Sequence, residues 1–229
     1  MVMTAARRPT RPGESAPRTE NARERILHTA YDLFAHHGIR AVGVDRIVAE
    51  SGVAKTTLYR HFASKDDLVV AALALREALW SRDWLQHEVE LRGGPASARL
   101  LAIFDVFGEW FRTDDYEGCL FMRTLLELGD RTTSPAAASI DALARIHRWL
   151  TGLAEEAGVR DPARFAGQWQ LLMLGSLVKT ATGDTEAGAE AHEVASLLLK
   201  RELAGGGADA PESAVPGAVR RRRNGEGGI

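Results

Sequence analysis

The chain has 229 residues, of which 45% are apolar and 26% are charged, a composition typical of a folded globular protein. Its single cysteine excludes an internal disulfide framework and any zinc site built on several cysteines. No apolar stretch is long enough to span a membrane, and residues 1–18 lack the apolar core of a secretory signal. We therefore expect a cytoplasmic protein without a membrane partner.

The charge is unevenly distributed along the chain. Residues 1–65 carry eleven Lys and Arg against six Asp and Glu, whereas the remaining residues carry 18 basic and 25 acidic side chains. A basic segment joined to an acidic body is typical of a small nucleic-acid-binding module attached to a second domain. Chance is the alternative explanation, and charge alone does not decide between them.

The hydrophobic periodicity between the two ends is helical throughout, and no useful length alternates with the period of a strand. Asn21 and Glu24 have the spacing of a capping box at the start of the first helix, which is expected to end before Gly38. Ser64 and Asp67 have the same spacing at the start of a long helix that reaches about residue 90.

Other helices follow from periodicity, glycines and prolines. Ser134-Pro135 and Asp161-Pro162 each place a cap residue before a proline at the first helical position. The expected helices, besides the two above, span residues 44–51, 55–62, 96–112, 119–129, 135–157, 162–182 and 186–203. The fold class is therefore all-α, with about nine helices.

Both ends of the chain are rich in Pro, Gly, Arg and small polar residues, and we expect residues 1–18 and 205–229 to be disordered. The first of these carries Arg7, Arg8, Arg11 and Arg18, which form either a basic arm that reaches DNA or a solvated tail. The same two interpretations apply to Arg220–Arg223.

The short helices at 44–51 and 55–62 are joined at Gly52, which suits the left-handed backbone of a tight turn. Apolar residues of both helices face inward, as in a helix-turn-helix. The outward side chains of the second helix all carry hydrogen-bond donors, and no acidic residue occurs between Ser51 and Lys65. Such side chains can bind phosphates or base edges.

The chain resembles TetR-type transcriptional regulators, the tetracycline-repressor family, in GVAKTTLYRHFASKDDL from Gly52 to Leu68 and in ILHTAYDLFAHHGIRAVGVDRIV before it. The resemblance implies an N-terminal three-helix helix-turn-helix domain, residues 19–66, and a C-terminal helical ligand-binding and dimerisation domain, residues 67–204. By position it implies that Lys55 and Thr56 face base edges. It also implies phosphate contacts by Thr57, Tyr59, His61 and Lys65.

The sequence departs from the family pattern at three places. Gly43 and Val42 stand where threonine is usual, which removes a hydroxyl contact to phosphate at the start of the helix at 44–51. Ala54 replaces a common serine, so the recognition helix is expected to lack a side-chain cap. Val48 stands where a smaller alanine is usual. These departures make the operator sequence unpredictable.

The last two helices are apolar on more than one face, which requires cover from both sides. A four-helix bundle across a two-fold axis would supply it, and a central core helix within one chain is the alternative. The residues expected at such a dimer interface are Leu171, Leu174, Val178, Ala191, Val194 and Leu198.

Large aromatic residues concentrate in the middle helices, and the family resemblance implies a ligand cavity there. Few charged groups point inward, so a mainly apolar or aromatic small-molecule effector is expected. Core packing is the alternative for each of these residues, above all for His147. The expected pocket residues are Trp84, Phe104, Phe107, Phe111, Cys119, Met122, Leu125, His147, Trp169 and Met173.

Cys119 follows Gly118 at the head of a helix, a place where the helix dipole lowers a thiol pKa. A redox or electrophile sensor is one interpretation of this cysteine. A small buried residue is the other.

No motif for catalysis, metal binding or a cofactor is present, so we expect neither an enzyme nor a bound cofactor. The sequence predicts a homodimeric repressor that binds a palindromic operator in double-stranded DNA and is released by an effector. An architectural DNA-binding protein and an all-α small-molecule-binding protein are the alternatives. The effector, the operator and the choice between repressor and activator stay open.

Overall fold

The computed structural model of this chain describes residues 21–114 and 116–204, whose regular elements are all helical. The expected basic arm, the C-terminal tail and Arg220–Arg223 lie outside the described residues. The described helices are α1 (Ala22–His37), α2 (Val44–Ser51), α3 (Lys55–His61), α4 (Lys65–Arg76), a π-helical segment η1 (Glu77–Gln86), α5 (His87–Arg92), α6 (Ala96–Phe111), α7 (Leu120–Leu128), α8 (Ser134–Glu156), α9 (Pro162–Thr180) and α10 (Ala187–Ala204).

The all-α fold class is confirmed. Because α4, η1 and α5 follow one another without a break, the described residues form nine continuous helical rods, the expected number. No helix in the described part of the chain is both long and apolar enough to cross a membrane.

The helix starts follow the capping residues of the sequence, with one correction. Asn21 and Glu24 form the expected capping box, and the Ser64 hydroxyl accepts a hydrogen bond from the Asp67 N–H at 3.0 Å. The cap of α8 is Thr133 and not Ser134, because the Thr133 hydroxyl accepts the Ala136 N–H and leaves Ser134 as the first helical residue.

The two short helices α2 and α3 lack side-chain caps. The N-cap residue, just before the first helical residue, is Gly43 for α2 and Ala54 for α3. Neither helix has a side-chain hydrogen bond at its N-terminus. The missing cap that the sequence predicts at Ala54 is thus confirmed. Gly52 ends α2 in the left-handed conformation, with φ of 66°, as the tight turn requires.

The long helix that begins after Ser64 differs from the sequence prediction in its middle. The ten residues of η1 are π-helical, although the segment contains neither Gly nor Pro. A π-helix has more than the 3.6 residues per turn of an α-helix, so residues four and five apart share a face. Hydrophobic periodicity does not reveal this change, because Trp80 and Trp84 fit either winding.

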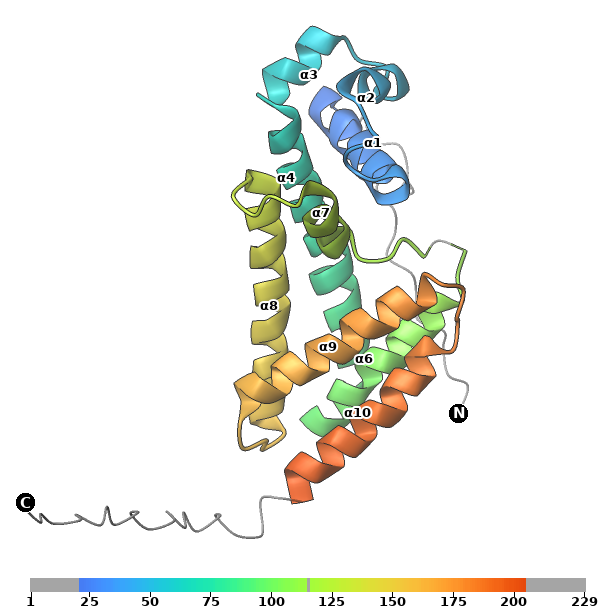
Figure 1. The fold of residues 1–229 in the computed structure, drawn as a ribbon, viewed down its shortest axis with the longest axis vertical. Coiled ribbons are helices and arrows are strands. Elements are labelled where there is room, and N and C mark those ends of the chain that lie inside the picture. Colours follow the sequence, from blue (N-terminus) through green and yellow to red (C-terminus); the bar gives the residue numbers. More distant parts are fainter. Residues whose placement is uncertain (1–20, 115, 205–229) are drawn as a thin grey trace, which may run out of the picture.

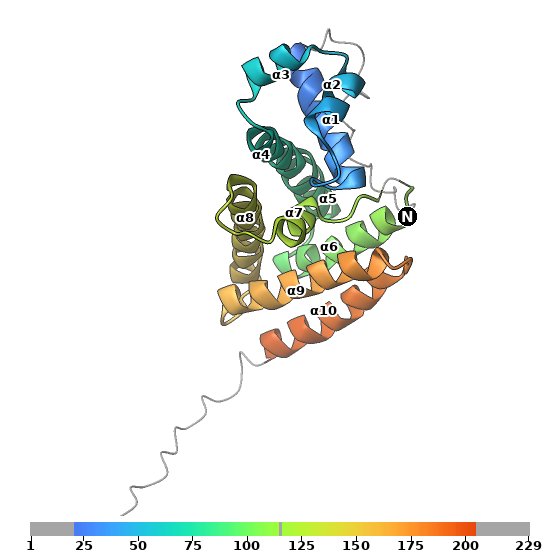
Figure 2. The same ribbon diagram turned by 45° about the horizontal axis from the view of Figure 1, so that its top comes forward.

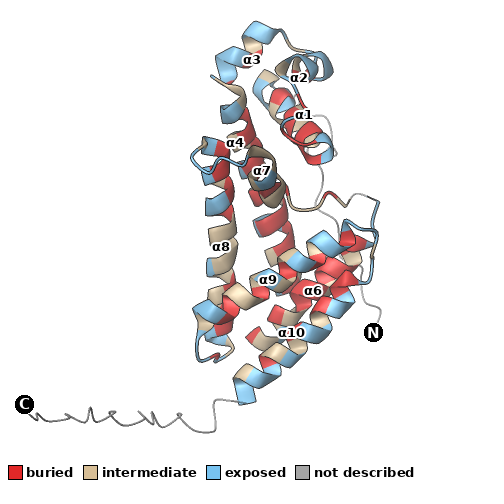
Figure 3. Ribbon diagram, viewed as in Figure 1, coloured by how far each residue is buried: buried red, intermediate tan, exposed pale blue. Residues whose placement is uncertain are grey.

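Two hydrophobic cores lie along the molecule (Figures 1 and 3). The first joins α1, α2 and α3 to α4, and it also includes Leu120 and Phe121 of α7 and Ala142 of α8. The second packs η1, α5 and α6 against the end of α8 and against α9 and α10. One continuous helical rod therefore connects both cores, and α7 and α8 extend the first core beyond the helix-turn-helix.

Helices α6 and α10 cross at two glycines. A methyl group on Gly188 would lie only 2.6 Å from the Cα of Gly108, so the two backbones are in direct contact at this point. The close approach allows α10 to lie along α6 and α9 as an outer layer (Figure 2). The Gly188→Ala substitution cannot be accommodated by moving a flexible side chain, because the neighbouring atoms belong to backbone.

We predict that Gly188→Ala lowers the free energy of unfolding by about 1–3 kcal/mol, through overpacking at this crossing. Urea denaturation measures the effect. Gly152→Ala in α8 is the matched control, since no atom lies within 4 Å of the added methyl group. That control should raise stability by roughly 0.5–1 kcal/mol, the usual gain when Ala replaces Gly in a helix. Equal effects of the two substitutions would contradict the packing argument.

Candidate nucleic-acid interface and internal cavity

The helix α3 lies at one end of the molecule with its polar face outward (Figures 1 and 3). Leu58 is fully buried and fixes the rotation of α3 against the first core. This orientation leaves five donor side chains of the helix exposed and Thr57 half-buried. The exposed ones are Lys55, Thr56, Tyr59, Arg60 and His61.

Lys55 is paired within the domain. Its Nζ donates a hydrogen bond to Oδ1 of Asp45 at 2.7 Å, and this hydrogen bond raises the pKa of the lysine. Both side chains are exposed, and exposed ion pairs contribute little to stability. The lysine can therefore exchange Asp45 for an acceptor on a ligand at small cost.

Lys65 has a contact that the sequence did not reveal. Its Nζ donates to the carbonyl oxygen of Ile39 at 2.6 Å, and burial lowers the pKa of this half-buried amine. The contact ties the start of α4 to the loop after α1. Because an ammonium group has three donors, Lys65 can hold this carbonyl and still bind an anion.

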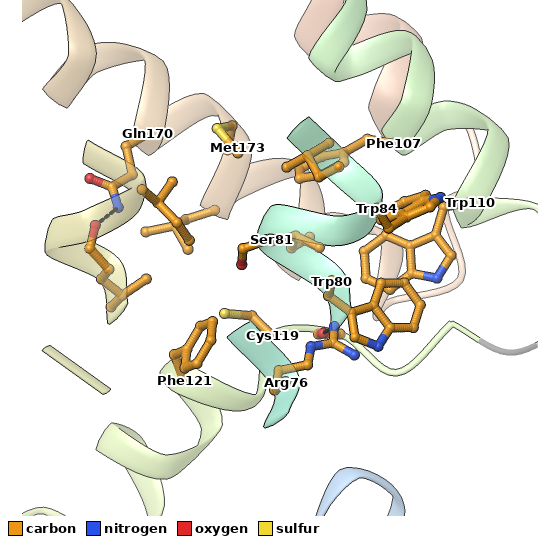
Figure 4. Close-up of a pocket in the computed structure, with 16 residues that line it drawn as sticks. Arg76, Trp80, Ser81, Trp84, Phe107, Trp110, Cys119, Phe121, Gln170 and Met173 are labelled. Atoms are coloured by element: carbon orange, nitrogen blue, oxygen red, sulfur yellow. Dashed lines mark hydrogen bonds between the residues drawn. The ribbon is translucent and has the colours of Figure 1, made fainter. Parts of the chain in front are cut away.

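A cavity lies between the π-helical segment, α6, α8, α9 and the start of α7 (Figure 4). The volume of this cavity is about 70 Å³. Most of its wall is aromatic or aliphatic. The lining residues are Arg76, Trp80, Ser81, Trp84, Leu85, Phe107, Trp110, Gly118, Cys119, Phe121, Leu143, Ile146, Gln170, Met173, Leu174 and Leu177.

Four of the ten expected pocket residues line this cavity, namely Trp84, Phe107, Cys119 and Met173. Their contact with an effector stays a prediction. The sequence missed Trp80, although it is one turn from Trp84, and it missed Arg76 and Ser81 because polar residues of a helix are expected to face solvent.

The other six do not line the cavity, because helix rotation and packing direct them elsewhere. Phe104 and Trp169 pack against each other in the second core, with ring centroids 5.4 Å apart, and Phe111 packs on Tyr116. On α7 the residue that reaches the cavity is Phe121, so Met122 and Leu125 do not. His147 lies near Gly167 of α9. The α8 residues that line the cavity are Leu143 and Ile146.

Arg76 belongs both to the cavity wall and to the junction of the two cores. Its guanidinium forms an ion pair with Glu117 at 2.8 Å, and both side chains are more than 90% buried. It also donates to the Tyr31 hydroxyl at 3.1 Å and to the Gly118 carbonyl at 2.8 Å. The guanidinium carbon lies 4.0 Å from the centre of the Trp80 ring, in cation–π contact.

Tyr31 brings α1 into the same network. Its hydroxyl donates to Glu117 at 2.9 Å and accepts the indole N–H of Trp80, also at 2.9 Å. Burial, together with the charge of Glu117, raises the pKa of this tyrosine and keeps it protonated. A single buried network thus links the cavity wall to the first helix of the N-terminal domain.

A second connection runs through α7. Oε2 of Glu127 accepts the backbone N–H groups of Ile39 at 2.7 Å and Arg40 at 3.0 Å, just after α1. Arg123, also on α7, donates a hydrogen bond to the backbone carbonyl of Ala35 on α1. Helix α7 thus starts at the cavity and ends against the loop before α2.

The expectation of a lowered thiol pKa at Cys119 is wrong. Cys119 is the residue before α7, but burial raises its pKa more than the neighbouring backbone N–H groups lower it. Desolvation disfavours the thiolate, and this effect outweighs the opposing charge of Arg76. Cys119 is half-buried in the cavity wall, and its role as a sensor stays a prediction.

Three of the six expected interface residues form an exposed apolar strip on α9 and α10. Leu171 is 70% exposed, Val178 65% and Val194 50%, and Leu197, which was not predicted, is 63% exposed. The other three are directed into the chain itself. Ala191 is buried in the second core, Leu198 is half-buried against it, and Leu174 lines the cavity.

No group of three or more His, Cys, Asp or Glu side chains that could hold a metal ion occurs among residues 21–114 and 116–204.

Comparison with known proteins relates this geometry to a known family. Residues 26–72 match the family model of "Bacterial regulatory proteins, tetR family". The described fold superposes on SCO4454, a TetR-family transcriptional regulator from Streptomyces coelicolor, with a TM-score of 0.72 and 25% identity, over 81% of this chain and 91% of that one. Residues 26–72 thus match the tetR family model, and the described fold superposes on a TetR-family structure.

This chain spans about half or less of the length of the curated relatives that it matches. It is 31% identical to the HTH-type transcriptional regulator QacR of Staphylococcus aureus over 72 residues, which are 31% of this chain and 38% of QacR. It is 31% identical to the HTH-type transcriptional regulator YxaF of Bacillus subtilis over 99 residues, 43% of this chain and 51% of YxaF. Both relatives are named as HTH-type transcriptional regulators.

We predict that Tyr31→Phe lowers the free energy of unfolding by about 1–3 kcal/mol, because it leaves the buried Trp80 N–H without an acceptor and takes one donor from Glu117. Urea denaturation with tryptophan fluorescence gives the value. Tyr59→Phe removes the same hydroxyl from an exposed tyrosine and should change stability by no more than ~0.5 kcal/mol. If both variants were equally stable, the network would not hold the junction.

Proposed function

We propose that this protein is a homodimeric repressor of the TetR type that binds a palindromic operator and is released by a small, mainly apolar or aromatic effector. The observation that carries the proposal is the exposed donor face of α3, whose rotation is fixed by the buried Leu58. A protein of this kind acts on chromosomal DNA, so its place of action is the cytoplasm.

In this proposal α3 enters the major groove of double-stranded DNA. Lys55 and Thr56, at the N-terminal end of the helix, read base edges. Thr57, Tyr59, His61 and Lys65 bind phosphates on either side and set the position of the helix. The proposal is supported by the exposure of Lys55 and Thr56 and by the absence of acidic side chains on α3 itself.

Two copies would associate through the apolar strip formed by Leu171, Val178, Val194 and Leu197. Helices α9 and α10 of both copies would then form a four-helix bundle, which buries side chains that one chain leaves in water. Two-fold symmetry presents two recognition helices to half-sites about one helical turn apart, roughly 34–36 Å. A palindromic operator follows from that symmetry.

Effector binding would reach the DNA through the two connections described above. A ligand in the cavity contacts the wall beside Arg76 and Trp80, and the network leads from there to Tyr31 of α1. The start of α7 lines the same cavity, and its other end holds the loop before α2 through Glu127. A ligand shifts the protein toward the conformer that it binds better, typically with about 1–3 kcal/mol of coupling.

Selection of bound duplexes from a random DNA pool at about 0.15 M salt tests the DNA-binding part. We expect enrichment of an inverted repeat. Lys55→Ala should relax one position in each half-site and cost about 1–3 kcal/mol on the selected operator. Arg148→Ala on α8 removes one exposed positive charge elsewhere and should leave the selected motif unchanged.

Two outcomes would contradict these assignments. Salt-sensitive binding without an enriched motif would favour an architectural DNA-binding protein. An equal loss of affinity for operator and random DNA in Lys55→Ala would show that this lysine contacts phosphate and not a base. Transcription from a promoter that contains the selected operator then distinguishes a repressor from an activator.

The dimer is tested by Leu171→Glu, which places a carboxylate in the apolar strip. Sedimentation equilibrium should show a monomer, and affinity for a two-half-site operator should fall because each copy then binds one half-site. Leu126→Glu on α7 is the matched control, since Leu126 is 77% exposed and lies outside the strip. A dimer that persists in Leu171→Glu would place the interface elsewhere.

A further inference from the structure

We propose that the cavity binds an electrically neutral, planar aromatic molecule with one hydrogen-bonding group, and that this group bonds to the hydroxyl of Ser81. The inference rests on the proposed effector-responsive function and names the chemical class of the ligand.

The first step is the charge of the wall. Arg76 is the one charged residue among those that line the cavity, and Glu117 at 2.8 Å compensates its charge. The thiol of Cys119 is held in its neutral form, since burial raises its pKa. A charged ligand would lose its water without meeting an uncompensated opposite charge, which is costly in an apolar site. The wall therefore supplies no uncompensated charged side chain to a cation or an anion, and a cation meets only the faces of the aromatic rings.

The second step is the state of the polar groups. The guanidinium of Arg76 donates to Tyr31, Glu117 and Gly118, and the amide nitrogen of Gln170 donates to the carbonyl of Leu143 at 2.9 Å. The hydroxyl of Ser81 has no hydrogen-bond partner in the described part of the chain, although the residue is only 9% exposed. Figure 4 shows this hydroxyl directed into the cavity, between Phe121 and Met173.

The third step is the shape of the wall around Ser81. The π-helical segment places Trp80, Ser81 and Trp84 together on the cavity side, and the indole rings of Trp80, Trp84 and Trp110 lie 4.6–5.6 Å apart. Aromatic rings prefer stacked or edge-to-face contact with other aromatic rings. A flat ring system can fill the space beside these indoles while one polar substituent reaches Ser81. Wide turns of this kind are frequent at functional sites.

Four probes with one ring system separate the possibilities: 2-naphthol, naphthalene, 2-naphthoate and 2-naphthylmethylammonium, titrated by calorimetry into the full chain at about pH 7. We expect 2-naphthol to bind most tightly. The anion and the cation should bind at least about tenfold more weakly than 2-naphthol, because each brings an uncompensated charge into the wall. Charged probes that bind as well as 2-naphthol, or 2-naphthol that does not bind, would overturn the proposal.

The variant Ser81→Ala tests the anchor. Affinity for 2-naphthol should fall about fivefold, or ~1 kcal/mol, the net value of one hydrogen bond, while affinity for naphthalene should not fall. Ser139→Ala is the matched control, since Ser139 is also buried and its hydroxyl is unpaired, but it lies outside the cavity wall. Equal losses for both probes in Ser81→Ala, or the same loss in Ser139→Ala, would refute the role of Ser81.

The failure of this inference is distinguishable from the failure of the proposed function. If 2-naphthol binds through Ser81 but the operator complex persists at saturating probe, the ligand class stands and effector release is wrong for this probe. If DNA binding responds only to a charged probe, effector release stands and the neutral class is wrong.

Discussion

The buried ion pair of Arg76 and Glu117 is the constraint on which the arrangement of the two cores depends. Both charges are removed from water, and the Tyr31 hydroxyl and the Gly118 carbonyl add hydrogen bonds to the pair. Trp80 donates to Tyr31 and places its ring against the Arg76 guanidinium. These partners come from α1, from the π-helical segment and from the loop before α7. A change in any of these elements leaves buried polar groups unpaired. The pair therefore fixes the N-terminal domain relative to the cavity.

This position gives the network two roles at once. The same guanidinium that holds α1 through Tyr31 also forms part of the cavity wall. Apolar packing alone would transmit a displacement weakly, because many small contacts can adjust. Hydrogen bonds between buried groups are directional and costly to break, so the junction favours discrete arrangements. Directional hydrogen bonds also hold the other end of α7, where one carboxylate oxygen of Glu127 accepts two backbone N–H groups.

The DNA-facing side follows a different principle, since its groups are exposed and weakly held. Lys55 is paired only with the exposed Asp45, and α2 and α3 begin without side-chain caps. Exposed ion pairs exchange easily for other partners. The rigid part of this domain is its core, in which Leu58 fixes the rotation of α3. The proposed recognition of DNA would thus combine a helix fixed by its core with exposed side chains that can change acceptors.

The sequence by itself determined the helices, the helix-turn-helix and the family resemblance, because those depend on local periodicity, on capping residues such as Asn21 and Ser64, and on a contiguous motif from Gly52 to Leu68. The family resemblance implied a cavity among the aromatic residues of the middle helices, and four of the residues expected there, Trp84, Phe107, Cys119 and Met173, line it. The sequence did not reveal Arg76, Ser81 or Glu117, because polar residues are expected outside until a partner distant in sequence is known. Only the tertiary structure decided those positions, the π winding of residues 77–86, the raised pKa of Cys119 and the burial of Ala191. Each of these depends on what another helix places against the residue, and hydrophobic periodicity carries no information about that neighbour.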